Sequence, residues 1–586
     1  MSKLNWHGRI QDIMATYGYE DTTWFFSTVL CFFTANAGFL KKLYVFIYVL
    51  VVAVYMYIAS VGNTYGFQPG FDTATSRVTK KWYSQLFPKA GNSFKFAESD
   101  GFRLPDFSYA GYHGGEREIP DIPVKVAISP IKGDNTMYIQ SALNRAVGGA
   151  LLLLPGVYRI RSEVIIPSHT VLRGSGPGKT FIDIDVEKTK RMSALVGHRS
   201  LKTVPRINHW RDCENHERFP VVGDIKKGAV TILLKTVRGL NVHDWIIVKN
   251  EVTDAFRREY NGVTRINGQK IWPSDESSLK FLRRITGITG NSIRIDQPIP
   301  HILKTRDKPH VLKITCMAEE IGLEDLSIGF TTPYDLARYK GVKAEYTPFH
   351  NSAAIRFGNV VNGWIKNIKS YSPSGTGIHL HSRGIVLQNS RWITVKNCDF
   401  GFPLPDLRFG GNGYVYVISM SNDCLIQDCI GRSGRDNYLL ALCSSGNVIS
   451  GCKSFDCRAR NDFHHSLNVA NLVENMEMTS ASHYFRGAFV TRNRGKTSMG
   501  AGITGSDNVF WKILIMTPGK TVVSEQATAD NGKGYVIGAT AVKGPIETTG
   551  SEWREGIGYE AGLQPASLYR EQLKLRLFQC TSFCAH

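Results

Sequence analysis

A three-residue pattern recurs through the second half of the chain and constrains the fold more than any other feature. Each copy is an apolar residue, a polar residue and then Asn, Asp or Gly. The copies are Leu323-Glu324-Asp325, Ile365-Lys366-Asn367, Val395-Lys396-Asn397, Ile426-Gln427-Asp428, Ile449-Ser450-Gly451 and Val473-Glu474-Asn475. Their third positions lie 42, 30, 31, 23 and 24 residues apart, which is typical of solenoid coils with loops of varying length. Asn, Asp and Gly tolerate the left-handed conformation that a tight bend requires.

The residue after each copy is apolar or soft, so the repeat also predicts a buried column. Its members are Leu326, Ile368, Cys398, Cys429, Cys452 and Met476. The three cysteines are expected to be stacked small hydrophobes rather than metal ligands. The predicted fold is all-β, a right-handed single-stranded parallel β-helix.

The chain before the repeat contains signals for a cap and an insertion. Gly133-Asp134-Asn135-Thr136 starts a short helix with Ile139, Leu143 and Ala146 on one face, and this helix should cap the solenoid. Basic loops interrupt the strands at about 190–315, which we interpret as an insertion. The predicted domains are a leading segment at 63–120, the β-helix at 121–516, and a C-terminal segment at 517–586 that packs on the solenoid.

The N-terminus contains a candidate membrane anchor. Leu43 to Val61 is 19 residues long and has no charged residue, which is long enough to span a bilayer. Lys41 and Lys42 precede it, so the positive-inside rule predicts a cytoplasmic N-terminus, a single transmembrane helix within 1–62, and an extracytoplasmic solenoid at a cell surface or viral envelope. A cleaved signal peptide and a buried core helix are the alternatives.

The charge balance favours an anionic partner. The chain has 70 Lys and Arg against 50 Asp and Glu, a net charge of +20. Such an excess suits an acidic polysaccharide, a membrane surface or nucleic acid, or it can simply keep the surface soluble. No nucleic-acid-binding module is recognisable, so no nucleic-acid partner is expected.

Several motifs resemble a known superfamily. The segments 133–143, 154–158 and 172–176 resemble the start of pectate-lyase-superfamily β-helices. Asp462-Phe463-His464 with Leu467 and Asn471-Leu472, and the ending Pro565 to Tyr569 with Gln572-Leu573, resemble a bacterial subgroup presumed to act on polysaccharides. The resemblance covers about residues 105 to 578. It implies the fold, but the superfamily includes lyases, hydrolases, epimerases and non-catalytic binders. The clustered Asp pairs and Gly-His-Gly of polygalacturonases are missing from the sequence.

Strand alternation predicts which polar side chains point outward. Phe463, Leu467 and Val469 are expected inside. The side chains expected on the outer face are His379, His381, Arg383, Tyr414, Tyr416, Arg432, Arg435, Asp462, His464 and Asn468. Because parallel coils stack about 4.8 Å apart, these residues should form one groove.

This set of side chains suits β-elimination in a uronic-acid polymer. Arg383 or Arg435 would neutralise the substrate carboxylate, and His464 or His381 would remove the C5 proton, with Asp462 orienting His464. The expected substrate-binding residues are His379, Tyr414, Tyr416, Arg432 and Asn468. No cofactor is expected. A Ca²⁺ site formed by Asp423, Asp428 or Asp436 stays open as an alternative, although no ligand spacing supports it.

Two functions from different classes remain open at this point. The first is a lyase that acts on an acidic polysaccharide. The second is a non-catalytic adhesin, spike or envelope component that binds glycan or builds a surface layer. The polar residues would then only solvate a strand face.

Overall fold

The structure is a computed structural model. It describes residues 80–185, 207–209, 214–260, 265–266, 269–270, 278–315, 317–331, 352–404, 413–480, 489–495, 501–516, 523–524, 533–541, 545–548 and 552–584. These residues belong to one compact unit, 79–586. The candidate membrane anchor at 43–61 lies outside the described residues, so it stays a prediction. Among the described helices, none has the length and apolarity needed to cross a bilayer.

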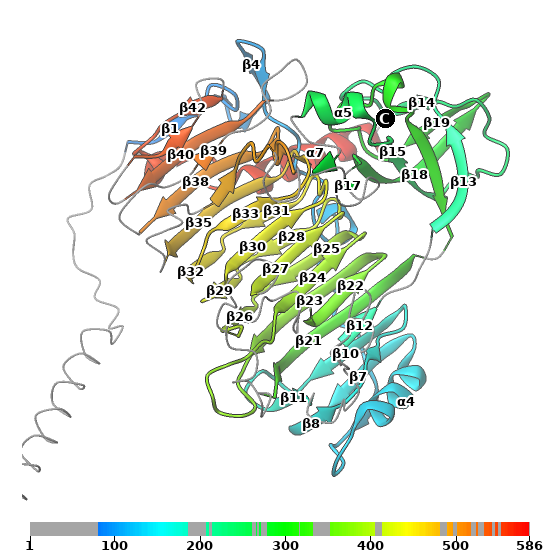
Figure 1. The fold of residues 1–586 in the computed structure, drawn as a ribbon, viewed down its shortest axis with the longest axis vertical. Helices are drawn as coiled ribbons and strands as arrows, with labels where there is room; N and C mark the ends of the chain where they lie inside the picture. The colour runs from blue at the N-terminus through cyan, green and yellow to red at the C-terminus, as the bar shows by residue number, and fades with distance from the viewer. Residues whose placement is uncertain are drawn as a thin grey trace, which may run out of the picture. The chain divides into compact units, whose positions relative to one another are not determined.

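The described chain is a parallel β-helix, because equivalent strands of successive coils pair in parallel (Figure 1). One face is a ten-stranded sheet. Its strands are β9 Val164–Ile165, β12 Ile207–His209, β22 Ala353–Gly358, β24 Arg383–Gln388, β27 Tyr414–Ser419, β30 Asp436–Ala441, β33 Asn461–His464, β36 Phe489–Thr491, β39 Val523–Ser524 and β41 Glu547–Thr548.

A seventeen-stranded sheet forms the other two faces. Its strands are β6 Val124–Ile128, β7 Gly149–Leu153, β8 Gly156–Ile160, β10 Thr170–Gly174, β11 Thr180–Ile184, β21 Ala318–Phe330, β23 Val360–Ser370, β25 Arg391–Lys396, β26 Asp399–Gly401, β28 Leu425–Gln427, β29 Ile430–Arg432, β31 Val448–Ser450, β32 Lys453–Cys457, β35 Leu472–Ser480, β38 Val509–Ile515, β40 Tyr535–Ala541 and β42 Trp553–Glu555. The parallel ladder reaches β42, so the β-helix continues past residue 516, where we expected it to end. The reason is that β40 and β42 keep the coil register without copying the sequence pattern of the repeat.

A left-handed bend divides each coil of the larger sheet into two parts, called here the pre-bend row and the post-bend row. The bend residues include all six third positions of the sequence repeat, with φ between 49° at Asn475 and 66° at Gly451. Asn397, for example, separates β25 from β26 and has φ 54°. The repeat is therefore a backbone requirement, as predicted, because few residues other than Asn, Asp and Gly adopt this conformation readily.

The predicted column is confirmed. Leu326, Ile368, Cys398, Cys429, Cys452 and Met476 are all at most 1% exposed and belong to one core cluster. The strand register stacks these residues on successive coils. Asp399 pairs with Ile430 and Ile430 with Lys453, so the cysteines that directly precede these three residues lie one above the other. The Sγ atoms of Cys429 and Cys452 lie 3.6 and 3.5 Å from carbonyl oxygens one coil earlier. The thiols therefore fill the core as small, weakly polar groups.

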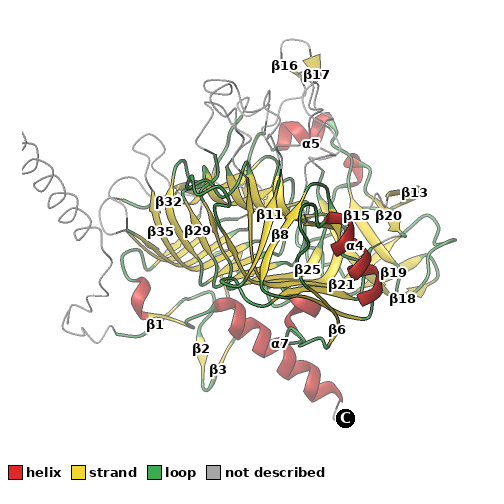
Figure 2. Cartoon of the chain, turned by 90° about the horizontal axis from the view of Figure 1, so that it is seen from below, coloured by secondary structure: helices red, strands yellow, loops and turns green. Residues whose placement is uncertain are grey.

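Other parts of the chain cover the ends and one face of the solenoid. The helix α4 Thr136–Ala146 buries Ile139, Leu143 and Ala146 against the first coil. The helix α7 Leu568–Cys584 and the leading segment lie along the pre-bend row (Figure 2). The Gln572 amide links them: it accepts a hydrogen bond from Phe107 N at 2.8 Å and donates one to Pro105 O at 3.0 Å.

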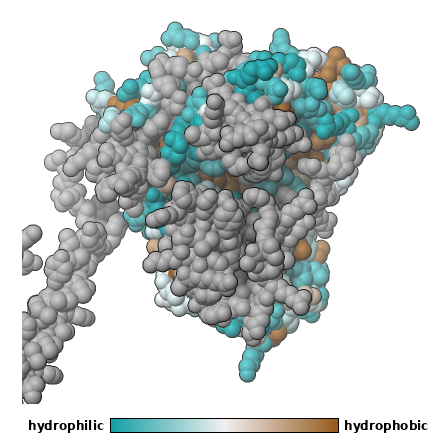
Figure 3. All heavy atoms as spheres, in the orientation of Figure 1, coloured by the Kyte–Doolittle hydropathy of each residue, from teal (hydrophilic) through white to brown (hydrophobic). Residues whose placement is uncertain are grey.

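The insertion is a six-stranded antiparallel sheet with its own core. Its strands are β13 Glu214–Pro220, β14 Thr231–Leu233, β15 Trp245–Lys249, β18 Lys280–Thr289, β19 Ser292–Ile295 and β20 His310–Ile314. Figure 3 shows hydrophilic side chains over much of the described surface at the upper right, where Figure 1 places this sheet.

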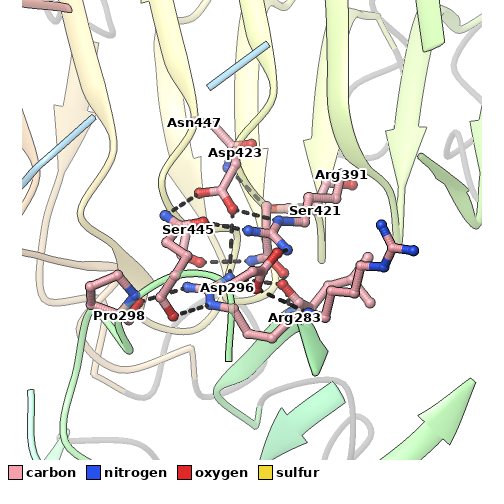
Figure 4. A network of polar contacts seen from close by, with 12 residues as sticks. Arg283, Asp296, Pro298, Arg391, Ser421, Asp423, Ser445 and Asn447 are labelled. Carbon is pink, nitrogen blue, oxygen red and sulfur yellow. Dashed lines mark hydrogen bonds and ion pairs between the residues drawn. The ribbon is translucent and has the colours of Figure 1, made fainter. Parts of the chain in front are cut away.

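A buried network of charges joins the insertion to the solenoid (Figure 4). Arg391, on the solenoid strand β25, donates hydrogen bonds to Asp296 at 2.6 Å and to Asp423 at 2.8 Å. Arg283 of the insertion lies 3.5 Å from Asp423. Removing one partner of such a buried pair typically costs about 3–5 kcal/mol, so the insertion and the solenoid should unfold together.

The cysteine column predicts a labelling pattern. In the native protein, Cys398, Cys429 and Cys452 should resist alkylation by a maleimide, because they are buried and because burial raises the pKa of the Cys429 thiol well above its ordinary value. After denaturation all three should react, as detected by peptide mass spectrometry. Native-state labelling of any one of them would contradict the register.

Candidate functional site

Polar side chains gather where three strands of the ten-stranded sheet begin. β24, β27 and β30 start at Arg383, Tyr414 and Asp436. Tyr414 pairs with Asp436, and the pairing of Ile385 with Tyr416 places Arg383 beside Tyr414. The Arg383 guanidinium lies 5.7 Å from the centroid of the Tyr414 ring. Three successive coils thus bring a cation, an aromatic ring and a carboxyl group to one edge.

His464 reaches this edge from the end of β33. Its ring centroid lies 6.3 Å from that of Tyr414 and 4.1 Å from that of His465. Burial lowers the pKa of His464 well below its ordinary value, and the charges of His465, Arg494, Arg383 and Arg435 lower it further. The imidazole is therefore neutral near pH 7, with three guanidinium groups within electrostatic reach.

Two aspartates lie behind these groups. Asp462 is 2% exposed and forms an ion pair with Arg494. Asp436 is 4% exposed; burial and the nearby Asp462 raise its pKa to about 7, while Arg435, Arg460 and Arg494 oppose the rise. The carboxyl of Asp436 therefore keeps its proton to a higher pH than an ordinary Asp side chain does.

The site has two layers. Arg383, Arg435 and His464 are partly exposed, so they can touch a ligand. Tyr414, Asp436, Asp462 and Arg494 are buried and support them. A neutral imidazole beside two accessible guanidiniums can accept a proton while a bound carboxylate is neutralised.

The side chains of His381 and Tyr416, both predicted site residues, pack inside the solenoid. His381 is buried: its Nε2 lies 2.9 Å from Thr331 O, its ring stacks 4.5 Å from Phe330, and burial lowers its pKa to about 4. The prediction failed because β24 begins only at Arg383, so strand alternation does not apply at 379–382. Tyr416 is also inside, where its hydroxyl lies 2.9 Å from both Cys398 O and Ile430 O and can donate its one proton to either.

The segment after β33 differs from the prediction in where its side chains point. Asn468 is fully buried: its Oδ1 accepts a hydrogen bond from Ser444 N at 3.2 Å and its Nδ2 donates one to Thr504 O at 3.0 Å. It holds the turns together and does not line a surface. Leu467 and Val469 are buried as expected, but they pack against the core of the insertion. The strand ends at His464, and His465 and Ser466 have positive φ, so alternation stops there.

His379 and Arg432 lie at a different corner from His464. Arg432 donates two hydrogen bonds to Asp399, at 2.8 and 3.1 Å, on the post-bend row. His379 Nδ1 lies 2.9 Å from Ser370 Oγ. The predicted residues that the structure brings together are thus His464, Asp462, Arg435, Arg383 and Tyr414.

Sequence reasoning missed the ion-pair partner Arg494 and the environment of Asp436. A signal for Arg494 was present: it follows Asp462 by 32 residues, which is about one coil.

The three aspartates considered for Ca²⁺ do not share a site, since Asp423 binds Arg391, Asp428 is exposed, and Asp436 belongs to the cluster above. Within the described ranges, no three His, Cys, Asp or Glu side chains are arranged to hold a metal ion.

Comparisons with known proteins find likenesses to solved structures at low sequence identity. No protein-family model and no curated protein sequence matches the chain. The tailspike gp61 of Pseudomonas phage phi297 is 11% identical, with a TM-score of 0.40, over 71% of this chain and 72% of the tailspike. The gp54 tailspike of Acinetobacter baumannii bacteriophage AP22, solved with a capsular saccharide, is 9% identical, with a TM-score of 0.28, over 71% and 74%. PfbA, a surface adhesin of Streptococcus pneumoniae, is 14% identical, with a TM-score of 0.32, over 74% and 81%.

The raised pKa of Asp436 predicts a pH-dependent stability. The native state keeps this proton up to about pH 7, whereas an unfolded Asp loses it near pH 4, so the contribution of Asp436 to stability falls as pH rises from 4 to 7. Asp436→Asn mimics the protonated form and removes this loss. The Tm of the variant minus that of the wild type should therefore increase from pH 5 to pH 8. A Tm difference that stays constant from pH 5 to pH 8 would contradict the raised pKa of Asp436.

Proposed function

We propose that this parallel β-helix protein binds an acidic glycan at the start of β24, β27 and β30 and cleaves it by β-elimination. The observation that carries the proposal is the excess of guanidinium groups around a neutral imidazole. Arg383, Arg435 and Arg494 all act on His464, and Asp462 pairs with Arg494. The remaining positive charge at the accessible layer suits a ligand carboxylate.

Each accessible residue has a role in this reaction. Arg383 and Arg435 bind the uronate carboxylate and stabilise the negative charge that develops when the C5 proton leaves. His464 is neutral and takes that proton. Tyr414 is 4% exposed and supports Arg383 and His464 from behind, so the leaving oxygen takes its proton from solvent as the C4–O bond breaks. The product then has a double bond between C4 and C5.

Hydrolysis is a second candidate, favoured by the two aspartates. A carboxyl pair in which one member keeps its proton is the arrangement that glycosidases use. Asp436 has the required raised pKa. Both carboxyl groups are at most 4% exposed, however, so they contact a glycan less readily than His464 does. We therefore rank elimination first.

The test uses His464→Ala on the full chain with polygalacturonate, alginate and hyaluronan as substrates. Elimination predicts an ultraviolet absorbance from unsaturated uronate in the wild type, and a loss of about a hundredfold or more in kcat for the variant. Arg435→Ala should raise KM and lower kcat together, because it removes a carboxylate contact that exists in the ground state and strengthens as negative charge develops in the transition state. His169→Asn is the matched control, since His169 is exposed on an early coil.

The outcomes separate the three functions. Full activity in His464→Ala contradicts the proposed base. Reducing ends without unsaturated products, abolished in Asp436→Asn, support hydrolysis instead. Binding of a polysaccharide that the wild type does not cleave supports the non-catalytic alternative.

A further inference from the structure

Phe402 has a backbone conformation that aromatic residues rarely adopt. Its φ is 53°, and it is 38% exposed. The same bend in the next two coils carries Ser433 with φ 49° and Asp456 with φ 50°. Ser and Asp suit a turn of this kind, whereas a bulky residue is strained there. Strain at an exposed position is characteristic of functional sites.

Trp392 shows how such strain is explained elsewhere in the fold. It has φ 58°, but its ring packs 5.7 Å from that of Trp245 and lies 4.1 Å from the Arg391 guanidinium, at the junction with the insertion. Packing therefore accounts for Trp392. The ring of Phe402 instead lies beside His379, with centroids 4.8 Å apart, and faces solvent over part of its surface.

Polar groups with fixed orientation lie in the same part of the fold: Phe402 N donates a hydrogen bond to Arg432 O at 3.0 Å, and Asp399 is within electrostatic reach of His379. Arg432 donates two hydrogen bonds to Asp399, and its guanidinium lies 5.5 Å from the Phe455 ring. The side chains of Arg432 and Asp399 are 34% and 29% exposed. Because a guanidinium has five N–H donors and Asp399 occupies two, the pair presents both donors and acceptors to solvent.

We propose that Phe402, His379, Arg432 and Asp399 form a second sugar-binding site, on which one pyranose ring stacks. The apolar C–H face of a sugar suits an exposed aromatic ring, and vicinal hydroxyls suit a fixed arginine–carboxylate pair. The site is separate from the Arg383–His464 cluster, since the chain between His379 and Arg383 passes through buried Leu380, His381 and Ser382. The inference rests on the proposed glycan function and adds a site that holds the polymer beside the reacting unit.

The experiment replaces Phe402 with Asn in the full chain. Asn tolerates the left-handed conformation, so Phe402→Asn should keep or raise the Tm. It should also weaken binding by about tenfold, the scale of one aromatic contact. Affinity is measured by calorimetry with oligogalacturonate, oligoalginate and a neutral dextran oligosaccharide. Ser433→Asn, at the same bend one coil later, should leave both the Tm and the affinity unchanged.

Three results would overturn the inference. If the wild type binds a saccharide and Phe402→Asn binds it equally well, this site is wrong while the proposed function stands. If Phe402→Asn lowers the Tm, Phe402 serves packing rather than binding. If the wild type binds none of the saccharides, the proposed glycan function and this site both fail.

Discussion

The left-handed bend between the pre-bend and post-bend rows is the constraint on which the rest of the molecule depends. It lets two strands meet at a sharp angle while their backbone groups pair with the coils above and below. The bend recurs in successive coils from Asp325 to Gly538. Because it has the same geometry each time, the residue that follows it always points into the core and forms the buried column. The same geometry aligns the starts of β24, β27 and β30, so a cluster of side chains from residues 383 to 464 can assemble without any local sequence motif.

The solenoid's attachments determine which outer faces remain for a ligand. The leading segment and α7 occupy the pre-bend row, and Glu474, fully buried, accepts a hydrogen bond from Tyr569 N at 3.2 Å at the start of α7. The insertion occupies the turns around Asn422 and Val469 and is held there by two ion pairs, Arg391–Asp296 and Arg283–Asp423. The two proposed sites lie on the other two faces, at the start of the ten-stranded sheet and on the post-bend row.

The sequence allowed the periodic part of this structure to be predicted, because periodicity is a local backbone property. Asn397 and Cys398 could be assigned to a bend and a core position from spacing alone. Alternation also placed Asp462 and His464 on the correct face. It failed at His381 and Asn468, which lie outside a strand or at its end, where the chain leaves the pleated geometry. It also failed at Tyr416, which lies within β27 but on the inward-facing side of the strand. The role of Arg494 depends on a contact between coils, and the pKa of Asp436 depends on burial, so neither follows from residue type.

The central claim is that an acidic glycan binds at the start of β24, β27 and β30. A crystal structure of the full chain with a uronic-acid oligosaccharide tests it most directly. We predict a ligand carboxylate within hydrogen-bonding distance of Arg383 or Arg435, with the C5 hydrogen of the same sugar facing His464. An oligosaccharide seated on the insertion sheet or at the solenoid cap, with the Arg383–His464 cluster empty, would contradict the account.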